Sequence, residues 1–309
     1  MHLSDTLRTR YAPSPTGYLH LGHVANAAWT WGAARALGGE VVLRIEDHDR
    51  TRCRPEYERA ILDDLEWLGF DPDAPPITSF RAGTSAFRQS DSTAHYEAAL
   101  EQLRGAGLAY VCECSRRDIA AEVPDVFNRE TRYPGTCRHR NLEPGPGRGW
   151  RIVMEPGTER FDDLRLGPHE QSPADQCGDL LARDRLGNWT YQFAVTVDDM
   201  RHGITLVVRG EDLLESTGRQ LRLARMLGRA EPLRLLHHAL ILKPGGEKLS
   251  KASGDTGIRE LRREGVTSGS ILGRAAALAG LLEVERAVEP EELGELVRTV
   301  TPAFRGLGD

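Results

Sequence analysis

Two motifs that lie far apart in the chain carry side chains able to bind phosphate. His-Leu-Gly-His at residues 20–23 follows a proline-rich segment and begins a predicted helix, so both imidazoles and the first helix amides are expected to face one anion. Lys-Leu-Ser-Lys at residues 248–251 follows Pro-Gly-Gly, and a loop with two ammonium groups and a hydroxyl can close over a triphosphate. The predicted chemistry is electrostatic stabilisation of phosphate charge rather than proton abstraction.

A third group of residues has the chemistry of a metal site. Cys112 and Cys114 stand close together, and Cys137 follows on a returning segment with Tyr133 before it and His139 after it. Three thiols and one further ligand suit tetrahedral zinc, with either Tyr133 or His139 as that ligand. The zinc is expected to be structural, one ion per chain, because it would pin a segment with little apolar content to bury.

The composition limits the classes of function. The 309 residues include 40 basic and 46 acidic side chains, a formal net charge of -6, which argues against a basic coat for nucleic acid and makes any RNA contact local. Five cysteines suit a reduced compartment better than a disulfide framework, and Cys53 and Cys177 are interpreted as packing residues. No apolar run approaches the roughly 18 residues that span a bilayer, so a cytoplasmic protein without a membrane partner is expected.

The order of the helices and strands expected around these motifs predicts an α/β fold with a doubly wound parallel sheet. An extended segment at 9–16, a helix at 24–37 and a buried strand at 40–45 form a strand–helix–strand unit, and such sheets bind ligands at the carboxyl ends of their strands. Residues 124–149, rich in Pro, Gly and Arg, indicate an insertion, and residues 189–197 alternate like a strand. The other predicted elements are a strand at 205–208 and helices at 56–68, 92–106, 213–227, 271–282 and 290–300.

Three further sequence blocks accompany the phosphate motifs. They are Arg-Tyr-Ala-Pro-Ser-Pro-Thr-Gly at residues 10–17, Arg-Ile-Glu-Asp at 44–47 and Val-Arg-Gly-Glu-Asp-Leu at 208–213. Together with the phosphate motifs, the blocks resemble the class I aminoacyl-tRNA synthetases, and within them the glutamyl subgroup. The resemblance implies a Rossmann-type catalytic domain that acts on L-glutamate and on ATP with Mg²⁺. Its implied ATP-binding residues are His20, Gly22, His23, Lys248, Ser250 and Lys251, of which His20, His23 and Lys251 are implied to be catalytic.

The implied amino-acid site matches the charges of glutamate. The substrate presents an ammonium and two carboxylates, so its pocket needs a carboxylate and preferably arginines, which bind carboxylates in a bidentate manner. Outside this context, Arg209 would indicate a surface ion pair with a neighbouring acid, and Tyr191 a core aromatic residue. The family's glutamate-binding positions fall here on Arg10, Tyr11, Ala12, Pro13, Ser14, Glu46, Tyr191 and Arg209, with Glu46 for the ammonium.

The same resemblance bears on the metal ligands. Related synthetases can end such a site in Cys-x-His, as Cys137 and His139 would, whereas the short relatives use a tyrosine four residues before the last cysteine, where Tyr133 stands. The predicted ligands are therefore Cys112, Cys114, Tyr133 and Cys137, with His139 as the alternative to Tyr133.

The expected domain order ends without an anticodon-binding domain. Residues 1–110 and 151–257 are expected to form the two halves of the catalytic domain, residues 111–150 the zinc-binding insertion, and residues 258–309 a short helical region like the start of a stem-contact region. This arrangement resembles the glutamyl-Q tRNA(Asp) synthetase family. Its members activate glutamate without tRNA and attach it to queuosine in the anticodon of tRNA(Asp).

Three other functions stay open at this point. A truncated glutamyl-tRNA synthetase would charge the 3′ end of tRNA, and a nucleotidyltransferase of the same fold would share the phosphate motifs but would not need Arg10, Glu46 and Arg209 together. A non-catalytic RNA-binding module should be rich in stacking aromatic residues, which make up only 6% of this chain. The expected partners of a monomer are glutamate, ATP and queuosine-bearing tRNA(Asp), whose backbone would contact basic residues such as Arg259, Arg262 and Arg263.

Overall fold

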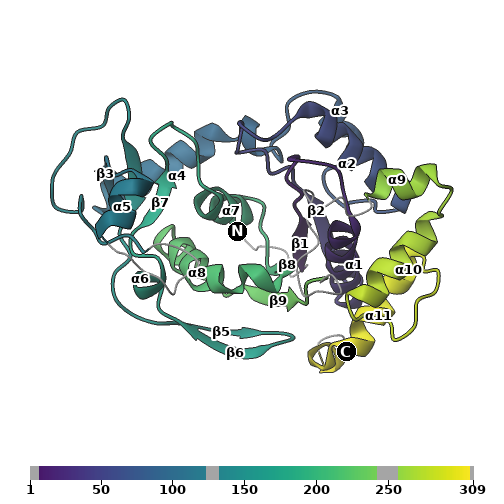
Figure 1. Ribbon diagram of the computed structural model, residues 1–309. Coiled ribbons are helices and arrows are strands. Elements are labelled where there is room, and N and C mark those ends of the chain that lie inside the picture. Colours follow the sequence, from purple (N-terminus) through teal and green to yellow (C-terminus); the bar gives the residue numbers. More distant parts are fainter. Residues whose placement is uncertain (1–6, 123–131, 242–256, 307–309) are drawn as a thin grey trace.

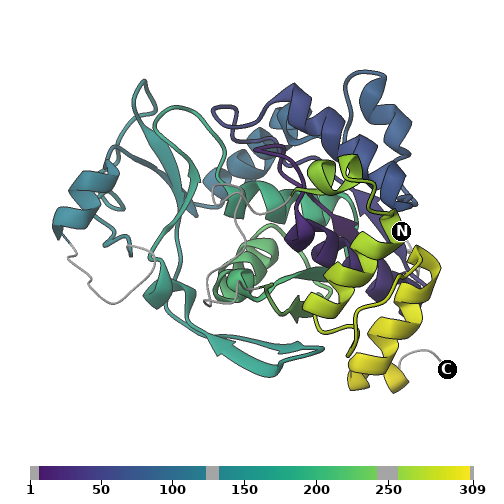
Figure 2. The ribbon, with the colours of Figure 1, turned by 45° about the vertical axis from the view of Figure 1, so that its right-hand side comes forward.

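The computed structural model describes residues 7–122, 132–241 and 257–306. A core built around parallel strands lies between an antiparallel lobe on one side and the C-terminal helices on the other (Figure 1). A view turned by 45° shows the same separation of the lobe from the C-terminal helices (Figure 2). No helix among the described residues is long and apolar enough to cross a bilayer.

The core is assembled from strands that are distant in the sequence. Strand β1 (Arg8–Tyr11) pairs in parallel with β2 (Glu40–Leu43), and β8 (Leu206–Gly210) pairs in parallel with β9 (Arg234–His238). The Thr205 amide donates to the Arg8 carbonyl at 2.9 Å, which places β8 beside β1. Strand β9 also meets β5 (Glu159–Asp163), which pairs antiparallel with β6 (Gly167–Gln171). The predicted strands at 40–45 and 205–208 are confirmed.

Most predicted helices are confirmed within a few residues. They are α1 (Leu21–Ala36), α2 (Pro55–Leu68), α4 (Thr93–Gly105), α8 (Thr217–Met226), α10 (Ser268–Leu278) and α11 (Leu293–Val300), and α3 (Ile77–Arg81) and α9 (Ile258–Arg263) are additional. Helix α1 begins where the histidine motif caps it, and it is buried along most of its length because Ala and Trp residues face neighbours on several sides.

The predicted strand at 189–197 is wrong, because this segment begins helix α7 (Tyr191–Arg201). Residues 193–199 are all buried, so the helix has no continuous polar face along this stretch. A helix that is buried on several sides loses the 3.6-residue apolar period, and its sequence then resembles the alternation of a strand.

The antiparallel lobe contains Cys112, Cys114 and Cys137. Strand β4 (Gly149–Ile152) pairs antiparallel with β3 (Ala109–Cys112) on one side and with β7 (Leu180–Arg183) on the other. The lobe also carries α5 (Arg116–Glu122) and α6 (Pro173–Gln176). The sheet therefore continues beyond residue 150, which lies inside β4.

The C-terminal helices pack against α1 and share its hydrophobic core. A Cβ atom added at Gly32 of α1 would lie 2.4 Å from Cγ2 of Val297 on α11, so the two helices approach closely at this glycine. The indole of Trp29 donates to the Ala279 carbonyl at 3.3 Å. These helices therefore pack as part of the same body as α1.

Candidate active site

A cavity of about 550 Å³ is lined by the ends of β1 and β8 and by the first turns of α1 and α7. The predicted residues Lys248, Ser250 and Lys251 lie outside the described residues. The tertiary structure gathers all the other predicted substrate residues in this cavity: Arg10, Tyr11, Ala12, Pro13, Ser14, His20, Gly22, His23, Glu46, Tyr191 and Arg209.

The two histidines of the first motif form the N-terminal cap of α1. The Gly22 amide donates to Nδ1 of His20 at 3.1 Å, and the His20 amide donates to Nδ1 of His23 at 3.1 Å. Because Nδ1 accepts in both rings, each neutral ring carries its proton on Nε2. The ring centroids are 3.9 Å apart. The Gly22 amide, which was expected to face an anion, is thus bonded to His20.

Arg10 belongs to a buried charge cluster, which we define as Arg10, Arg44, Glu46, Asp198 and Asp199. Nε of Arg10 donates to Oδ1 of Asp199 at 3.0 Å, and Nη1 of Arg44 donates to the same oxygen at 2.7 Å. Nη2 of Arg44 donates to Oε1 of Glu46 at 2.8 Å. Burial alone would raise the pKa of Asp199, but Arg10 and Arg44 hold it below its usual value. Asp199 therefore already balances Arg10, which was predicted to bind the substrate.

Arg209 is as deeply buried, but its hydrogen-bond partners are neutral. Its guanidinium donates to Oε1 of Gln220 at 2.6 Å, to Oγ1 of Thr217 at 2.8 Å and to Nε2 of His237 at 2.9 Å. We call Arg209 with these three residues the Arg209 pocket. Among the described residues, no ion pair joins Arg209 to a carboxylate, so the alternative of a surface ion pair with a neighbouring acid does not hold. Burial lowers the pKa of Arg209, as expected for a cation that lacks a bonded anion.

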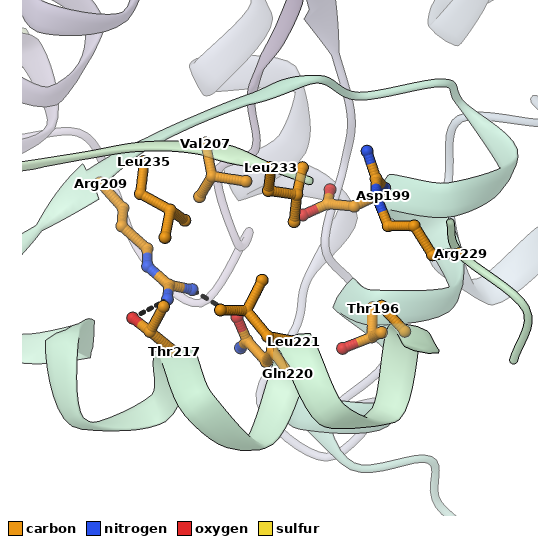
Figure 3. A pocket seen from close by; sticks show the side chains of 11 residues that line it. Thr196, Asp199, Val207, Arg209, Thr217, Gln220, Leu221, Arg229, Leu233 and Leu235 are labelled. Atoms are coloured by element: carbon orange, nitrogen blue, oxygen red, sulfur yellow. Dashed lines mark hydrogen bonds between the residues drawn. The ribbon is translucent and has the colours of Figure 1, made fainter. Parts of the chain in front are cut away.

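A second, much smaller cavity of about 20 Å³ separates the two arrangements (Figure 3). Arg209 with Thr217 and Gln220 lies on one side of it, and Asp199 lies on the other. This volume has room for about one water molecule, so it is too small to be the substrate site.

Several residues of the site were missed from the sequence. Asp199 balances Arg10, and His237 and Gln220 hold Arg209. The only sequence signal was the acidic pair Asp198 and Asp199 at the end of an apolar segment, where a buried acid indicates a cationic partner. His237 lies in an apolar strand, which gives no sign of its partner.

The predicted metal ligands meet in the antiparallel lobe. The sulfur atoms of Cys112, Cys114 and Cys137 lie within 4.8 Å of one another. The hydroxyl of Tyr133 is 3.4 Å from the Cys112 sulfur and 3.8 Å from the Cys114 sulfur, whereas His139 is exposed and is not part of this group of thiols. Cys53 and Cys177 also lie outside this group. The lobe therefore places Tyr133, rather than His139, next to the thiols.

The surroundings of this cluster suit a metal bound by thiolates. Nε of Arg151 donates to the Cys112 sulfur at 3.4 Å, and Nη1 of Arg140 lies 3.9 Å from the Cys137 sulfur. Such donors stabilise the negative charge of metal-bound thiolates. The three sulfurs and one phenol oxygen therefore fit a tetrahedral zinc site.

Comparisons with known proteins agree with the geometry. The family model of tRNA synthetases class I (E and Q), catalytic domain, matches residues 6–281. A protein of Nitratidesulfovibrio vulgaris called glutamyl-Q tRNA(Asp) synthetase is 40% identical, over 97% of this chain and 95% of its own length. A protein of Burkholderia mallei with the same name is 44% identical, over 80% of this chain and 81% of its own.

A solved structure has the same fold. The crystal structure of a glutamate tRNA ligase from Elizabethkingia meningosepticum in complex with its amino acid matches with a TM-score of 0.75 and 27% identity. The match covers 95% of this chain and 65% of the ligase, so the chain spans just under two thirds of that protein's length.

Proposed function

This chain belongs to the class I tRNA synthetases for glutamate and glutamine, in the family of the glutamyl-Q tRNA(Asp) synthetases, and we propose that it activates L-glutamate with ATP and transfers it to queuosine in tRNA(Asp). The environment of Arg209 is the observation that supports glutamate as the substrate. A buried guanidinium whose bonded partners are all neutral needs an anion, and the side-chain carboxylate of glutamate supplies one. Membership of this family leaves no support for a nucleotidyltransferase or a non-catalytic RNA-binding module.

The proposed first step needs no nucleophile from the protein. The α-carboxylate of glutamate attacks the α-phosphate of ATP in line, and pyrophosphate leaves. His20, His23 and Lys251 stabilise the phosphate charge, and Mg²⁺ arrives with the nucleotide. Glu46 holds the substrate ammonium, and Tyr191 lies beside it in the same cavity. Catalysis in this scheme is positioning plus electrostatics.

In the second proposed step, a hydroxyl of the queuosine cyclopentene ring attacks the carbonyl carbon of the adenylate. An ester bond forms to glutamate, and AMP leaves with the bonding electrons of the mixed anhydride. The alternative acceptor is the 3′-terminal ribose of tRNA, as in a glutamyl-tRNA synthetase. Both acceptors present a hydroxyl to the same adenylate, so the first step does not distinguish them.

We propose that helix α9 contributes to RNA binding. The Ile258 amide donates to the Leu19 carbonyl at 3.0 Å, which fixes α9 next to the histidine motif. Exposed Arg259 lies 5.1 Å above the ring of Tyr18, and exposed Arg262 lies 4.9 Å above the ring of Trp67. We propose that the chain is a cytoplasmic monomer and that these cations contact phosphates of its tRNA partner. The rate of glutamate transfer to tRNA should then fall steeply as the salt concentration rises, whereas the rate of glutamate activation should barely change.

The proposed zinc is structural and is held by Cys112, Cys114, Cys137 and Tyr133. Bound to these residues, the ion would cross-link β3 to the loop that contains Tyr133 and Cys137. The site lies in the lobe, away from the cavity that holds the predicted substrate residues.

The test separates activation from acceptor choice. Glutamate-dependent exchange between pyrophosphate and ATP is measured without tRNA, and it should proceed. [¹⁴C]Glutamate transfer is then measured with tRNA(Asp) that contains queuosine, with the same tRNA lacking queuosine, and with queuosine-bearing tRNA(Asp) from which the 3′-terminal adenosine has been removed. Transfer should need queuosine and survive loss of the 3′ adenosine. The opposite pattern would make the protein a glutamyl-tRNA synthetase.

A further inference from the structure

A chain of buried hydrogen bonds connects Arg209 to an acid on another strand. Nδ1 of His237 lies 2.7 Å from Oδ2 of Asp163, and the His237 amide donates to the same oxygen at 3.0 Å. On the other side of the ring, Nε2 of His237 is 2.9 Å from Nε of Arg209. His237 and the side chain of Asp163 are completely buried. The chain thus runs from β5 through β9 to β8, three neighbouring strands of the core.

The partners on the two sides determine which nitrogen of His237 carries the proton. The carboxylate of Asp163 can only accept, so Nδ1 must be the donor on that side. The guanidinium of Arg209 can only donate, so Nε2 must present its lone pair. A neutral ring with its proton on Nδ1 satisfies both partners. Burial, which lowers the pKa of His237, favours the same neutral state.

The imidazole also separates the negative charge of Asp163 from Arg209. A carboxylate in the place of Nε2 would pair with Arg209 directly, as Asp199 pairs with Arg10. An imidazole holds the guanidinium in a fixed position without cancelling its charge, because the acid lies one ring away. The uncharged side chains of Thr217 and Gln220 accept hydrogen bonds from the other two nitrogens of the Arg209 guanidinium (Figure 3).

We infer that Asp163 and His237 are positioning residues that orient Arg209 for the side-chain carboxylate of the substrate and make the site select glutamate over glutamine. The inference rests on the proposed function, since it takes the ligand of Arg209 to be glutamate. Glutamine offers a neutral amide, which leaves the charge of Arg209 unmatched. Selection therefore requires that the protein itself supply no bonded anion, and the Asp163–His237 chain meets this requirement.

Two substitutions of His237 differ in whether they leave a hydrogen-bond acceptor for Arg209. In His237→Gln, the side-chain oxygen can reach the position of Nε2 and accept from Arg209. In His237→Asn, the shorter side chain can donate to Asp163 but offers no acceptor to Arg209. We expect His237→Asn to raise the KM for glutamate by about 30-fold and to reduce glutamate-over-glutamine selection by about tenfold, with kcat nearly unchanged. His237→Gln should stay within about fivefold of wild type in both quantities.

Asp163→Asn tests the proton position with almost no change in size. Oδ1 of Asp163 accepts from the amides of Arg165 and Leu166 at 3.0 and 2.9 Å, so an asparagine would keep its oxygen there and turn its NH₂ group toward His237, whose backbone amide would also lose its acceptor. The ring would then have to protonate Nε2, which faces the donors of Arg209. We expect the KM for glutamate to rise at least about tenfold, because the amide would hold the ring in the wrong tautomer for Arg209. Asp162→Asn, at the exposed neighbouring position of β5, is the matched control and should leave the KM unchanged.

Two readouts separate positioning from a merely structural role. Pyrophosphate exchange gives KM for glutamate, for glutamine and for ATP, and ¹⁵N NMR of labelled histidine reports the proton position of the ring without any substrate. Wild type should show Nδ1 protonated, Asp163→Asn should show Nε2 protonated, and KM for ATP should stay within about twofold.

Defined results would overturn the inference. It is wrong if His237→Asn keeps the selection of wild type, if both His237 variants change the KM for ATP as much as the KM for glutamate, or if Nε2 is protonated in wild type. Absence of glutamate-dependent exchange in wild type would instead reject the proposed function, while the NMR result would still report on the Asp163–His237–Arg209 chain.

Discussion

Two buried arginines line the same cavity, and their charges are balanced in opposite ways. Arg10 at β1 and Arg209 at β8 are 5% and 4% exposed. Arg10 is bonded to Asp199, whereas the side chains bonded to Arg209 are all neutral. Residue type and burial therefore do not show whether a buried arginine has a bonded anion, because that depends on the partners that the fold places beside it. Disrupting the charge cluster should cost stability, and disrupting the Arg209 pocket should cost binding.

The largest loss of stability is expected for Asp199→Asn. This change leaves Arg10 and Arg44 buried without their shared anion, and breaking a buried pair costs about 3–5 kcal/mol. The melting temperature should fall by on the order of 10 °C. Asp162→Asn, at an exposed position of β5, is the control and should melt like wild type. Normal melting of Asp199→Asn together with loss of glutamate activation would assign Arg10, and not Arg209, to the substrate.

Arg209→Ala should produce the reverse result. The KM for glutamate should rise by about 10²-fold or more, and the preference for glutamate over glutamine, expected to be about 10³ in wild type, should erode. The melting temperature should change less than in Asp199→Asn, because no buried acid loses its partner. Arg234→Ala, exposed on neighbouring β9, is the control for a lost arginine. Equal activation of glutamate and glutamine by wild type would contradict the assignment of Arg209.

Lys251→Ala extends the comparison to a cation that lies outside the described residues. Its ammonium is proposed to meet the phosphates mainly as pyrophosphate leaves, so kcat for activation should fall by about 10²-fold, with a smaller effect on the KM for glutamate. Rates of pyrophosphate exchange measure both quantities. A rate within a few fold of wild type would remove Lys251 from the site.

A third buried arginine sharpens the comparison. Arg151 donates to the Cys112 sulfur, and its guanidinium carbon lies 3.6 Å from the ring centre of Tyr133. The negative charge that balances Arg151 would therefore be that of a metal-bound thiolate. Protein purified without added metal should contain one zinc per chain. Cys112→Ser should lose nearly all of it and melt several degrees lower. Tyr133→Phe should lose more zinc than His139→Ala, and folded wild-type protein free of zinc would reject the site.

The smallest effect concerns a buried acid without a bonded arginine. Burial raises the pKa of Asp64 to about 6, and its Oδ2 has no hydrogen-bond partner among the described residues. A folded-state pKa above the unfolded value means that ionised Asp64 destabilises the protein above pH 6, and that this penalty disappears as pH falls toward 4. Asp64→Asn should therefore stabilise the protein by on the order of 2 kcal/mol at pH 7.5 and by little near pH 4. Equal differences in unfolding free energy at both pH values would contradict this.

The sequence predicted the longer helices other than α7, together with strands β1, β2 and β8, whereas strands β3 to β7 and β9 were not predicted. Helices α1 and α2 and strand β2 follow from apolar patterns that neighbouring residues create. Helix α7 was missed because burial on several sides removed its polar face. For the site, the sequence predicted residues that the structure gathers in one cavity, but it gave no sign that Arg10 is bonded to an acid and Arg209 to neutral side chains.

What the sequence alone determined is the local chemistry: the histidine motif at the start of a helix, the spacing of the thiols, and the arginines and acids that glutamate would require. These features depend on residues a few positions apart. Only the tertiary structure decided which charges are balanced. Asp199 meets Arg10 across 189 positions of the chain, and Asp163 meets His237 across 74. No spacing encodes such pairs, because they form only where the sheet brings distant strand ends together and excludes the water that would otherwise screen their charges.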